Sequence, residues 1–182
     1  MTDLAHAARL PKADTLAVTV TVPADGVRTT SAPSEVHDFV LDAATRLEFD
    51  GKHDSFSVVP APPTSSFTTL VMVGLPADSP VLDPLRYAAG VAARAAKGSL
   101  ALAFTTTNTA ESTHVAEGAA LAAIPAFTRK SSDNAPALAS ITVVGKHKPD
   151  LDAVRASRDA VKVVRDLVTE VPNILSPDEL AR

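Results

Sequence analysis

The residues of this chain that could support chemistry are few and lie far apart. Five histidines occur, at positions 6, 37, 53, 114 and 147, and no two of them have the spacing of metal ligands. The one suggestive pair is His114 and Glu117, which would lie one turn apart on a helix and could offer two ligands to a metal ion. A competent site needs at least three ligands with supporting groups, so the sequence predicts an ordinary polar pair on a helix surface.

Two sets of basic residues could instead bind an anion. Segment 144–148 (Val-Gly-Lys-His-Lys) lacks the upstream glycine and the downstream Ser or Thr of a phosphate-binding loop, so it is interpreted as a solvent-exposed connection. Arg86, Arg94 and Lys97 would form a polar stripe along one helix. A solvated helix face is the simpler interpretation of that stripe, and contact with an anion or a partner subunit is the alternative.

Composition excludes whole classes of chemistry. The chain has no cysteine, which removes disulfides, thiolate zinc sites, iron–sulfur clusters and cysteine nucleophiles. It contains no nucleophile elbow, dinucleotide fingerprint or phosphate loop. The formal net charge is −4 with no dense basic field, so strong nucleic-acid binding is not expected. We therefore predict no catalytic, cofactor-binding or metal-binding residue in this chain.

The sequence also bears on localisation. The N-terminus has neither the basic nor the apolar region of a secretory signal. No apolar run approaches the roughly 18 residues that indicate a membrane-spanning helix. A cytoplasmic protein without a membrane partner is therefore expected.

Alternating strands and helices would hold these residues in place. Strands are expected at 15–22, 56–59, 67–74, 99–104 and 139–144. The first alternates strictly, which predicts one buried face, whereas 67–74 is almost continuously apolar, which predicts burial on both faces. Helices are expected after Ser34 as N-cap, from Asp83 and Pro84 to Gly98, at about 110–124 and at 150–170. This alternation predicts an α/β domain with helices on both faces of the sheet.

The last residues carry a well-formed helix start with little helix behind it. Ser176 is placed as an N-cap, Pro177 at the first helical position, and Glu179 where it can complete a capping box. Only 180–182 follow, whereas isolated helices shorter than about 12–15 residues are marginal in water. The segment is therefore either a short turn packed on the domain or the front of an element in a longer protein. The preceding helix, 150–170, has an apolar seam formed by Leu151, Val154, Val161, Val164 and Val168.

Five stretches of the chain occur in an order that is characteristic of one family. They are 70–75 (Leu-Val-Met-Val-Gly-Leu), 85–95, 115–123, the basic loop 129–131, and 164–177, which ends in Asn-Ile-Leu-Ser-Pro. Together they resemble the leucyl aminopeptidases, also called cytosol aminopeptidases. The resemblance covers about residues 67–182 well and 1–66 in general layout.

The resemblance implies a fold, a division of the chain and a parent activity. The family's N-terminal domain is similar to a macro domain, a three-layer α/β fold with a central mixed sheet between helices. Residues 1–149 would form this macro-like domain, and 150–182 the inter-domain helix and the start of a catalytic domain that is absent here. Family members hydrolyse N-terminal residues from peptides with two divalent metals, zinc or manganese. The implied partners are the parent's own catalytic domain and the other subunits of a homo-hexamer.

The family's catalytic motifs are absent from this chain. Residues 144–146 match three letters of its Val-Gly-Lys-Gly motif, and 116–118 match three letters of its Asn-Thr-Asp-Ala-Glu-Gly-Arg motif, but the residues around both differ. The resemblance therefore implies a non-catalytic segment with no cofactor of its own. The alternative is a stand-alone macro-like module for an ADP-ribose-type nucleotide, although the chain has no glycine cluster for a phosphate loop.

Overall fold

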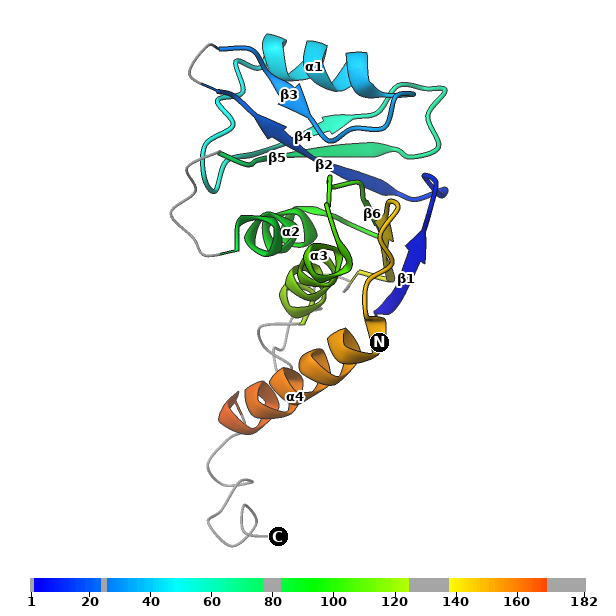
Figure 1. Cartoon of the computed structure of the whole chain (residues 1–182), viewed down its shortest axis with the longest axis vertical. Coiled ribbons are helices and arrows are strands. Elements are labelled where there is room, and N and C mark those ends of the chain that lie inside the picture. The colour runs from blue at the N-terminus through cyan, green and yellow to red at the C-terminus, as the bar shows by residue number, and fades with distance from the viewer. Residues whose placement is uncertain (1, 24–25, 77–82, 125–137, 170–182) are drawn as a thin grey trace, which may run out of the picture.

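Residues 2–23, 26–76, 83–124 and 138–169 are described by the structure, a computed structural model, and they form a sheet between layers of helices (Figure 1). The strands are β1 (Asp3–Ala7), β2 (Thr15–Thr21), β3 (Thr29–Thr30), β4 (Phe56–Pro60), β5 (Thr69–Gly74), β6 (Ser99–Leu102) and β7 (Ser140–Val144). The helices are α1 (His37–Arg46), α2 (Pro84–Ala95), α3 (Thr109–Ala122) and α4 (Leu151–Thr169). None of the helices in these described residues is long and apolar enough to cross a membrane.

The strands form one mixed sheet. Their order is β1-β7-β6-β2-β5-β4, and β3 pairs with the end of β2. The first five strands in that order are parallel, whereas β4 runs antiparallel to β5 at one edge. The register aligns Leu16 of β2 with Ala101 on one side and Leu70 on the other. The predicted three-layer α/β fold with a mixed central sheet is confirmed.

Both faces of the sheet are covered. Helix α1 packs on one face, and α2 and α3 pack on the other (Figure 1). Leu16, Val18 and Val20 contribute to the core under α1, whereas Ala17 contributes to the core under α2 and α3. The small side chain of Ala17 allows the alanine-rich helices α2 and α3 to approach the sheet closely. The prediction of a single buried face for 15–22 is therefore wrong, because β2 lies in the middle of the sheet with layers on both sides.

Helix α2 begins as its sequence predicts. Asp83 is the N-cap, its carboxylate accepts a hydrogen bond from the Arg86 N–H at 3.1 Å, and Pro84 takes the first helical position. The other expected helices and strands are present with ends that differ by a few residues. The strand expected at 56–59 is β4, which forms an edge of the sheet.

Helix α1 begins later than predicted. Its first residue is His37, its N-cap position is Val36, and no side chain caps it. The Val36 N–H instead bonds to the Pro33 carbonyl at 3.0 Å. This turn carries the chain past Ser34, so the prediction of Ser34 as N-cap is wrong.

Strand β1 is an element that the sequence pattern does not predict. Its five residues are too few and too polar to show a period, and it forms by pairing with β7, where Leu4 aligns with Ile141. Arg155 and Arg158 of α4 donate hydrogen bonds to the carbonyls of Leu4 and Thr2, at 3.1 and 3.0 Å. These contacts cover an edge of the sheet that would otherwise present unpaired carbonyls.

The apolar seam predicted for the last helix is buried along only the first part of α4. Val154 is buried, whereas Val164 and Val168 are 59% and 79% exposed. Figure 1 shows α4 extending away from the sheet, so its second half carries apolar side chains on the surface. The helix start predicted at 176–179 and the basic loop at 129–131 lie outside the described residues.

Candidate functional site

His114 and Glu117 lie on one face of α3 but face different partners. The His114 Nδ1 atom is 2.6 Å from the Asp83 carboxylate at the start of α2. One oxygen of Glu117 accepts a hydrogen bond from the Ser157 hydroxyl of α4 at 2.7 Å, and the other lies 3.4 Å from the Arg86 guanidinium of α2. The two side chains therefore link α3 to α2 and α4, in addition to forming the polar pair on the surface of α3 that the sequence predicts.

These contacts leave no metal site in this region. Among the residues that the structure describes, no group of three His, Asp or Glu side chains could hold a metal ion. The Glu117 carboxylate is already bonded to two other side chains. The described residues therefore offer no site for the two divalent metals that the resemblance implies for the catalytic domain of the parent.

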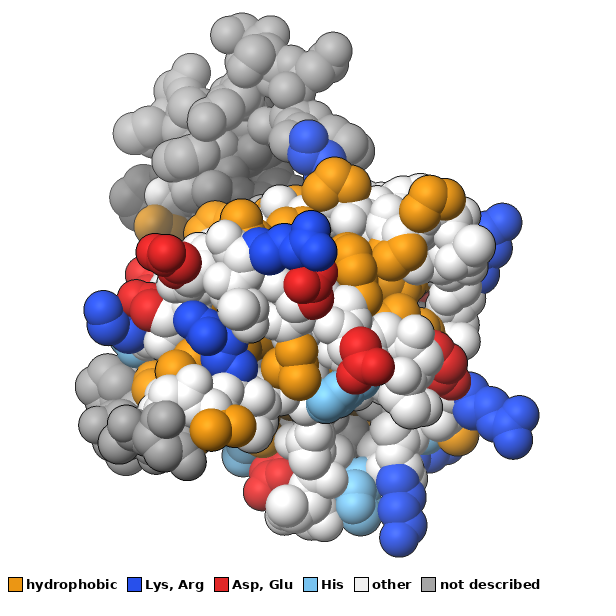
Figure 2. Space-filling view, turned by 90° about the horizontal axis from the view of Figure 1, so that it is seen from above, with side chains coloured by type: hydrophobic (Ala, Val, Ile, Leu, Met, Phe, Trp, Pro, Cys, Tyr) orange, Lys and Arg blue, Asp and Glu red, His pale blue; other side chains and the backbone are white. Residues whose placement is uncertain are grey.

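The basic groups do not form one anion site either. The side chains of Arg86, Arg94 and Lys97 are all exposed. Arg86 lies beside the Glu117 carboxylate, which already neutralises its charge. The face of the molecule seen from above in Figure 2 carries basic and acidic side chains interspersed, with apolar side chains between them. On that face the positive charges are not collected into one dense patch.

The turn at 144–148 is fixed by its backbone. The Gly145 N–H donates to the Ala7 carbonyl at 3.0 Å, and the Gly145 carbonyl lies 2.9 Å from Nε2 of His6. The His147 carbonyl accepts a hydrogen bond from the buried Ser112 hydroxyl of α3 at 2.7 Å. The segment is thus a connection tied to β1 and α3, with the side chains of residues 146 and 148 exposed as predicted.

Three cavities follow segment 8–14, which joins β1 to β2. Since β1 and β2 both run parallel to their neighbours, this segment crosses the sheet from its carboxyl edge to its amino edge, and Leu10 and Ala13 pack into the core under α1. The cavities have volumes of about 350, 360 and 360 Å³, and neighbouring ones share lining residues. They lie where an extended segment, rather than a helix, covers this part of the sheet.

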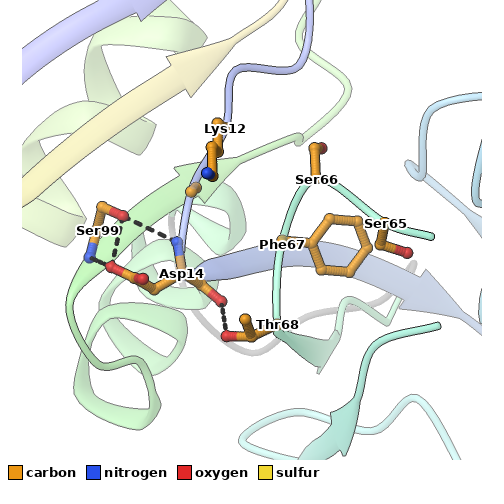
Figure 3. A pocket seen from close by; sticks show the side chains of 8 residues that line it. Lys12, Asp14, Ser65, Ser66, Phe67, Thr68 and Ser99 are labelled. Carbon is orange, nitrogen blue, oxygen red and sulfur yellow. Dashed lines mark hydrogen bonds between the residues drawn. The ribbon is translucent and has the colours of Figure 1, made fainter. Parts of the chain in front are cut away.

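The cavity at the amino edge is organised around Asp14 (Figure 3). One carboxylate oxygen of Asp14 accepts hydrogen bonds from the Ser99 N–H and the Ser99 hydroxyl, both at 2.7 Å. The Asp14 carbonyl accepts a hydrogen bond from the Thr68 hydroxyl at 2.8 Å. Gly98 adopts φ +68°, and a Cβ there would lie 2.3 Å from the Asp14 carboxylate. This arrangement clamps the starts of β2, β5 and β6 together.

The electrostatics of Asp14 favour a structural role. Hydrogen bonds from the Ser99 N–H and hydroxyl lower the pKa of the Asp14 carboxyl below its usual value of 3.8. A carboxylate held in its ionised form is a poor proton donor at neutral pH. Sequence reasoning missed this clamp, although Asp14 immediately precedes the expected strand 15–22, Ser99 is the first residue of the expected strand 99–104, and the starts of parallel strands meet at one edge.

Removal of the Ser99 hydroxyl tests the clamp. We expect Ser99→Ala to raise the pKa of Asp14 toward 3.8, since one donor to the carboxylate is lost. A lowered folded-state pKa contributes stability above the unfolded pKa and loses it as pH falls through the folded pKa, so the variant should lose less stability on acidification. Carboxyl NMR titration measures the shift. Ser66→Ala, in the same cavity, is the control, and an equal shift in both variants would contradict the assignment.

A second polar cluster lies beside α2. The ring of His53 stacks on Tyr87 with centroids 4.5 Å apart, and the Tyr87 hydroxyl donates a hydrogen bond to the Asp54 carboxylate at 3.0 Å. That bond raises the pKa of the Tyr87 phenol above 10.0. The cluster fastens the loop before β4 to α2.

Tyr87 is the only tyrosine, and the chain has no tryptophan, so its ionisation can be followed alone. We expect Asp54→Asn to lower the pKa of Tyr87 toward 10.0, because the carboxylate that disfavours the phenolate is removed. The phenolate absorbance during an alkaline titration measures this shift. Asp42→Asn, on the exposed face of α1, should leave the titration unchanged. A midpoint that does not move in Asp54→Asn would show that this contact is not formed.

Comparison with known proteins finds relatives that are named probable cytosol aminopeptidases. No family model matches the chain. The probable cytosol aminopeptidase of Rhodopseudomonas palustris (strain BisA53) is 31% identical over 160 residues, which are 80% of this chain and 32% of the relative. That of Rhodococcus erythropolis is 32% identical over 154 residues, 78% of this chain and 30% of the relative. The chain thus spans about a third of the length of the curated relatives it matches.

Solved structures share the fold. A variant of tomato leucine aminopeptidase matches with a TM-score of 0.70 at 19% identity, over 100% of this chain and 41% of that one. The bottromycin maturation enzyme BotP, solved in complex with Mn, matches with a TM-score of 0.60 at 23% identity, over 93% of this chain and 34% of that one. In sequence the chain is therefore similar to the leucyl (cytosol) aminopeptidases, and its fold matches that of the N-terminal domain of a leucine aminopeptidase.

Proposed function

We propose that this chain is the non-catalytic N-terminal domain of a cytoplasmic leucyl aminopeptidase. The rest of that protein would hydrolyse N-terminal residues from peptides with two divalent metals, zinc or manganese. The observation that carries the proposal is the exposed apolar surface on the second half of α4. Relatives about three times as long, named cytosol aminopeptidases, support the same conclusion.

The first half of α4 packs against the domain, whereas the second half exposes its apolar side chains. In the first half, Val154 is buried and Arg158 is only 6% exposed, with its guanidinium bonded to the Thr2 carbonyl and to Asp159. In the second half, the large apolar side chains are exposed: Val163 57%, Val164 59%, Leu167 40% and Val168 79%. A contiguous apolar surface of this kind marks a site of interaction with another polypeptide surface. The proposal places the catalytic domain of the parent on it.

The proposal assigns the metals to the parent's catalytic domain. The described residues lack a cluster of three metal ligands, and Glu117 is engaged between helices. The BotP structure, which shares the fold, was solved in complex with Mn, and this supports a metal-dependent parent. We also propose that the parent assembles as a homo-hexamer, which light scattering of the natural protein would measure.

A turnover assay tests the non-catalytic role. Residues 1–182 alone, incubated with manganese and a leucyl chromogenic substrate, should release no chromophore above the blank, whereas the natural protein under the same conditions should. Metal-dependent release by residues 1–182 would contradict the proposal. Failure of the natural protein to act on any N-terminal residue with zinc or manganese would contradict the parent activity.

Substitution on α4 in the natural protein tests the docking surface. Val168→Asp should destabilise the contact with the catalytic domain, because burial of an unpaired carboxylate in an apolar interface is costly. Ala153→Asp, on an exposed position in the first turn of the same helix, is the matched control. Limited proteolysis after α4 measures the contact. Equal cleavage of both variants and the unaltered protein would contradict this placement.

A further inference from the structure

The cavity at the carboxyl edge of the sheet has no part in the function above. We propose that it is a binding site for a free apolar amino acid, with the ligand carboxylate on Arg9 and the ligand ammonium group on Glu35. The cavity has a volume of about 350 Å³, at the lower end of the range for small-molecule sites. The inference is independent of the aminopeptidase activity of the parent.

The position of the cavity is one where open α/β sheets bind ligands. Its lining includes residues 8–10 after β1, 103–104 after β6 and Gly145 after β7, which are the carboxyl ends of parallel strands. In the sheet, β2 and β6 are neighbours. The chain continues from β2 to β5 in one lateral direction and from β6 to β7 in the opposite direction. Adjacent strands whose connections diverge in this way open a crevice at their carboxyl ends, and the residues that follow β6 line the cavity beside this point.

The lining places two opposite charges on separate segments. Arg9 comes from the segment after β1, and Glu35 comes from the turn before α1. Within the described part of the chain neither side chain has a hydrogen bond or an ion pair, and the two do not pair with each other. Both side chains are exposed, so water solvates them in the absence of a ligand. A ligand that carries both a carboxylate and an ammonium group would pair with both side chains at once, whereas an anion or a cation would pair with only one.

The remaining lining residues of the cavity are mostly apolar and would contact a short apolar side chain of the ligand. Leu10, Pro33 and Phe104 line the cavity, and Phe104 is buried against the sheet. A Cβ placed on Gly145 would meet nothing within 4 Å, so space remains open over this residue. Ser34 adds a hydroxyl beside Glu35 that can accept a hydrogen bond from the ammonium group. These features favour an aliphatic side chain of the size of leucine.

Three probes with the same side chain separate the two charges. Leucine, N-acetyl-leucine and leucinamide are titrated into residues 1–182 while amide resonances are followed by NMR. We expect leucine to bind with a Kd of about 1 mM and to shift the amides of Arg9, Glu35, Phe104 and Gly145. Each analogue lacks one charge and should bind at least about tenfold more weakly. Equal affinity for leucine and either analogue, or shifts located elsewhere, would overturn the proposal.

Variants assign the two charges. Arg9→Gln and Glu35→Gln should each weaken leucine binding at least about tenfold. Lys12→Gln, which changes an exposed cation in the cavity at the opposite edge, should bind leucine as the unaltered chain does. The titration of Tyr87 reports whether each variant is folded. Unchanged binding in Arg9→Gln or Glu35→Gln, or displacement of leucine by ADP-ribose at lower concentration, would overturn the proposal.

Discussion

Gly118→Ala should lower the free energy of unfolding by about 2–3 kcal/mol, a large effect for one methyl group. Gly118 lies on α3 where that helix packs against α2, and a Cβ on it would lie 2.0 Å from the Arg86 carbonyl. The obstructing atom is backbone, so relief requires one helix to move. The gain of roughly 0.5–1 kcal/mol that alanine brings to a helix only partly offsets this cost.

A neighbouring glycine provides the control. Gly90 lies on α2 in the same interface, yet a Cβ there would meet nothing closer than 3.5 Å, so Gly90→Ala should be neutral or slightly stabilising. Urea unfolding measures both variants, and the melting temperature of Gly118→Ala should fall by about 4–12 °C. Equal stability of the two variants would show that the helices are not in close contact at Gly118.

Gly74→Ala should cost about 2–3 kcal/mol for a related reason. Gly74 ends β5, and its Cβ would lie 2.1 Å from the Lys52 carbonyl and 2.4 Å from the Ser55 hydroxyl. The loop before β4 would have to move, although the Gly74 N–H bonds to the Ser55 carbonyl at 2.9 Å. Movement of that loop would also separate Asp54 from Tyr87.

Two measurements therefore follow Gly74→Ala. Urea unfolding gives the loss of stability, and the alkaline titration of Tyr87 should shift toward 10.0 as the contact with Asp54 is lost. Gly26→Ala is the control, because Gly26 has φ +76° but open space around it, so alanine there adds only the backbone strain of about 1 kcal/mol. A loss no larger than in Gly26→Ala would contradict the close packing at Gly74.

Elements that are determined by neighbouring residues are predicted from the sequence, whereas elements that depend on residues far along the chain are not. The cap and first turn of α2 follow from Asp83 and Pro84 alone, and they were predicted correctly. The start of α1 is not predicted correctly, because a turn closed by the Pro33 carbonyl overrides the preference of Ser34 for an N-cap. β1 exists through contacts with β7 and α4, which lie far along the chain, and no local pattern could reveal it.

The candidate sites show the same limit. His114 and Glu117 do lie on one helix face, but the partners that engage them come from α2 and α4. The cavity at the carboxyl edge joins residues from four segments, and Arg9 and Glu35 carry no motif that sequence spacing could detect. Such sites depend on topology, which brings the ends of parallel strands together.

The most direct test of the central claim is the sequence of the natural subunit, read by mass spectrometry of its peptides. If this chain is the N-terminal domain of a leucyl aminopeptidase, the subunit should be about three times as long, in keeping with its relatives. Peptides beyond Arg182 should then contain the Val-Gly-Lys-Gly and Asn-Thr-Asp-Ala-Glu-Gly-Arg motifs of the family. A natural subunit that ends at Arg182, or continues without those motifs, would contradict the claim.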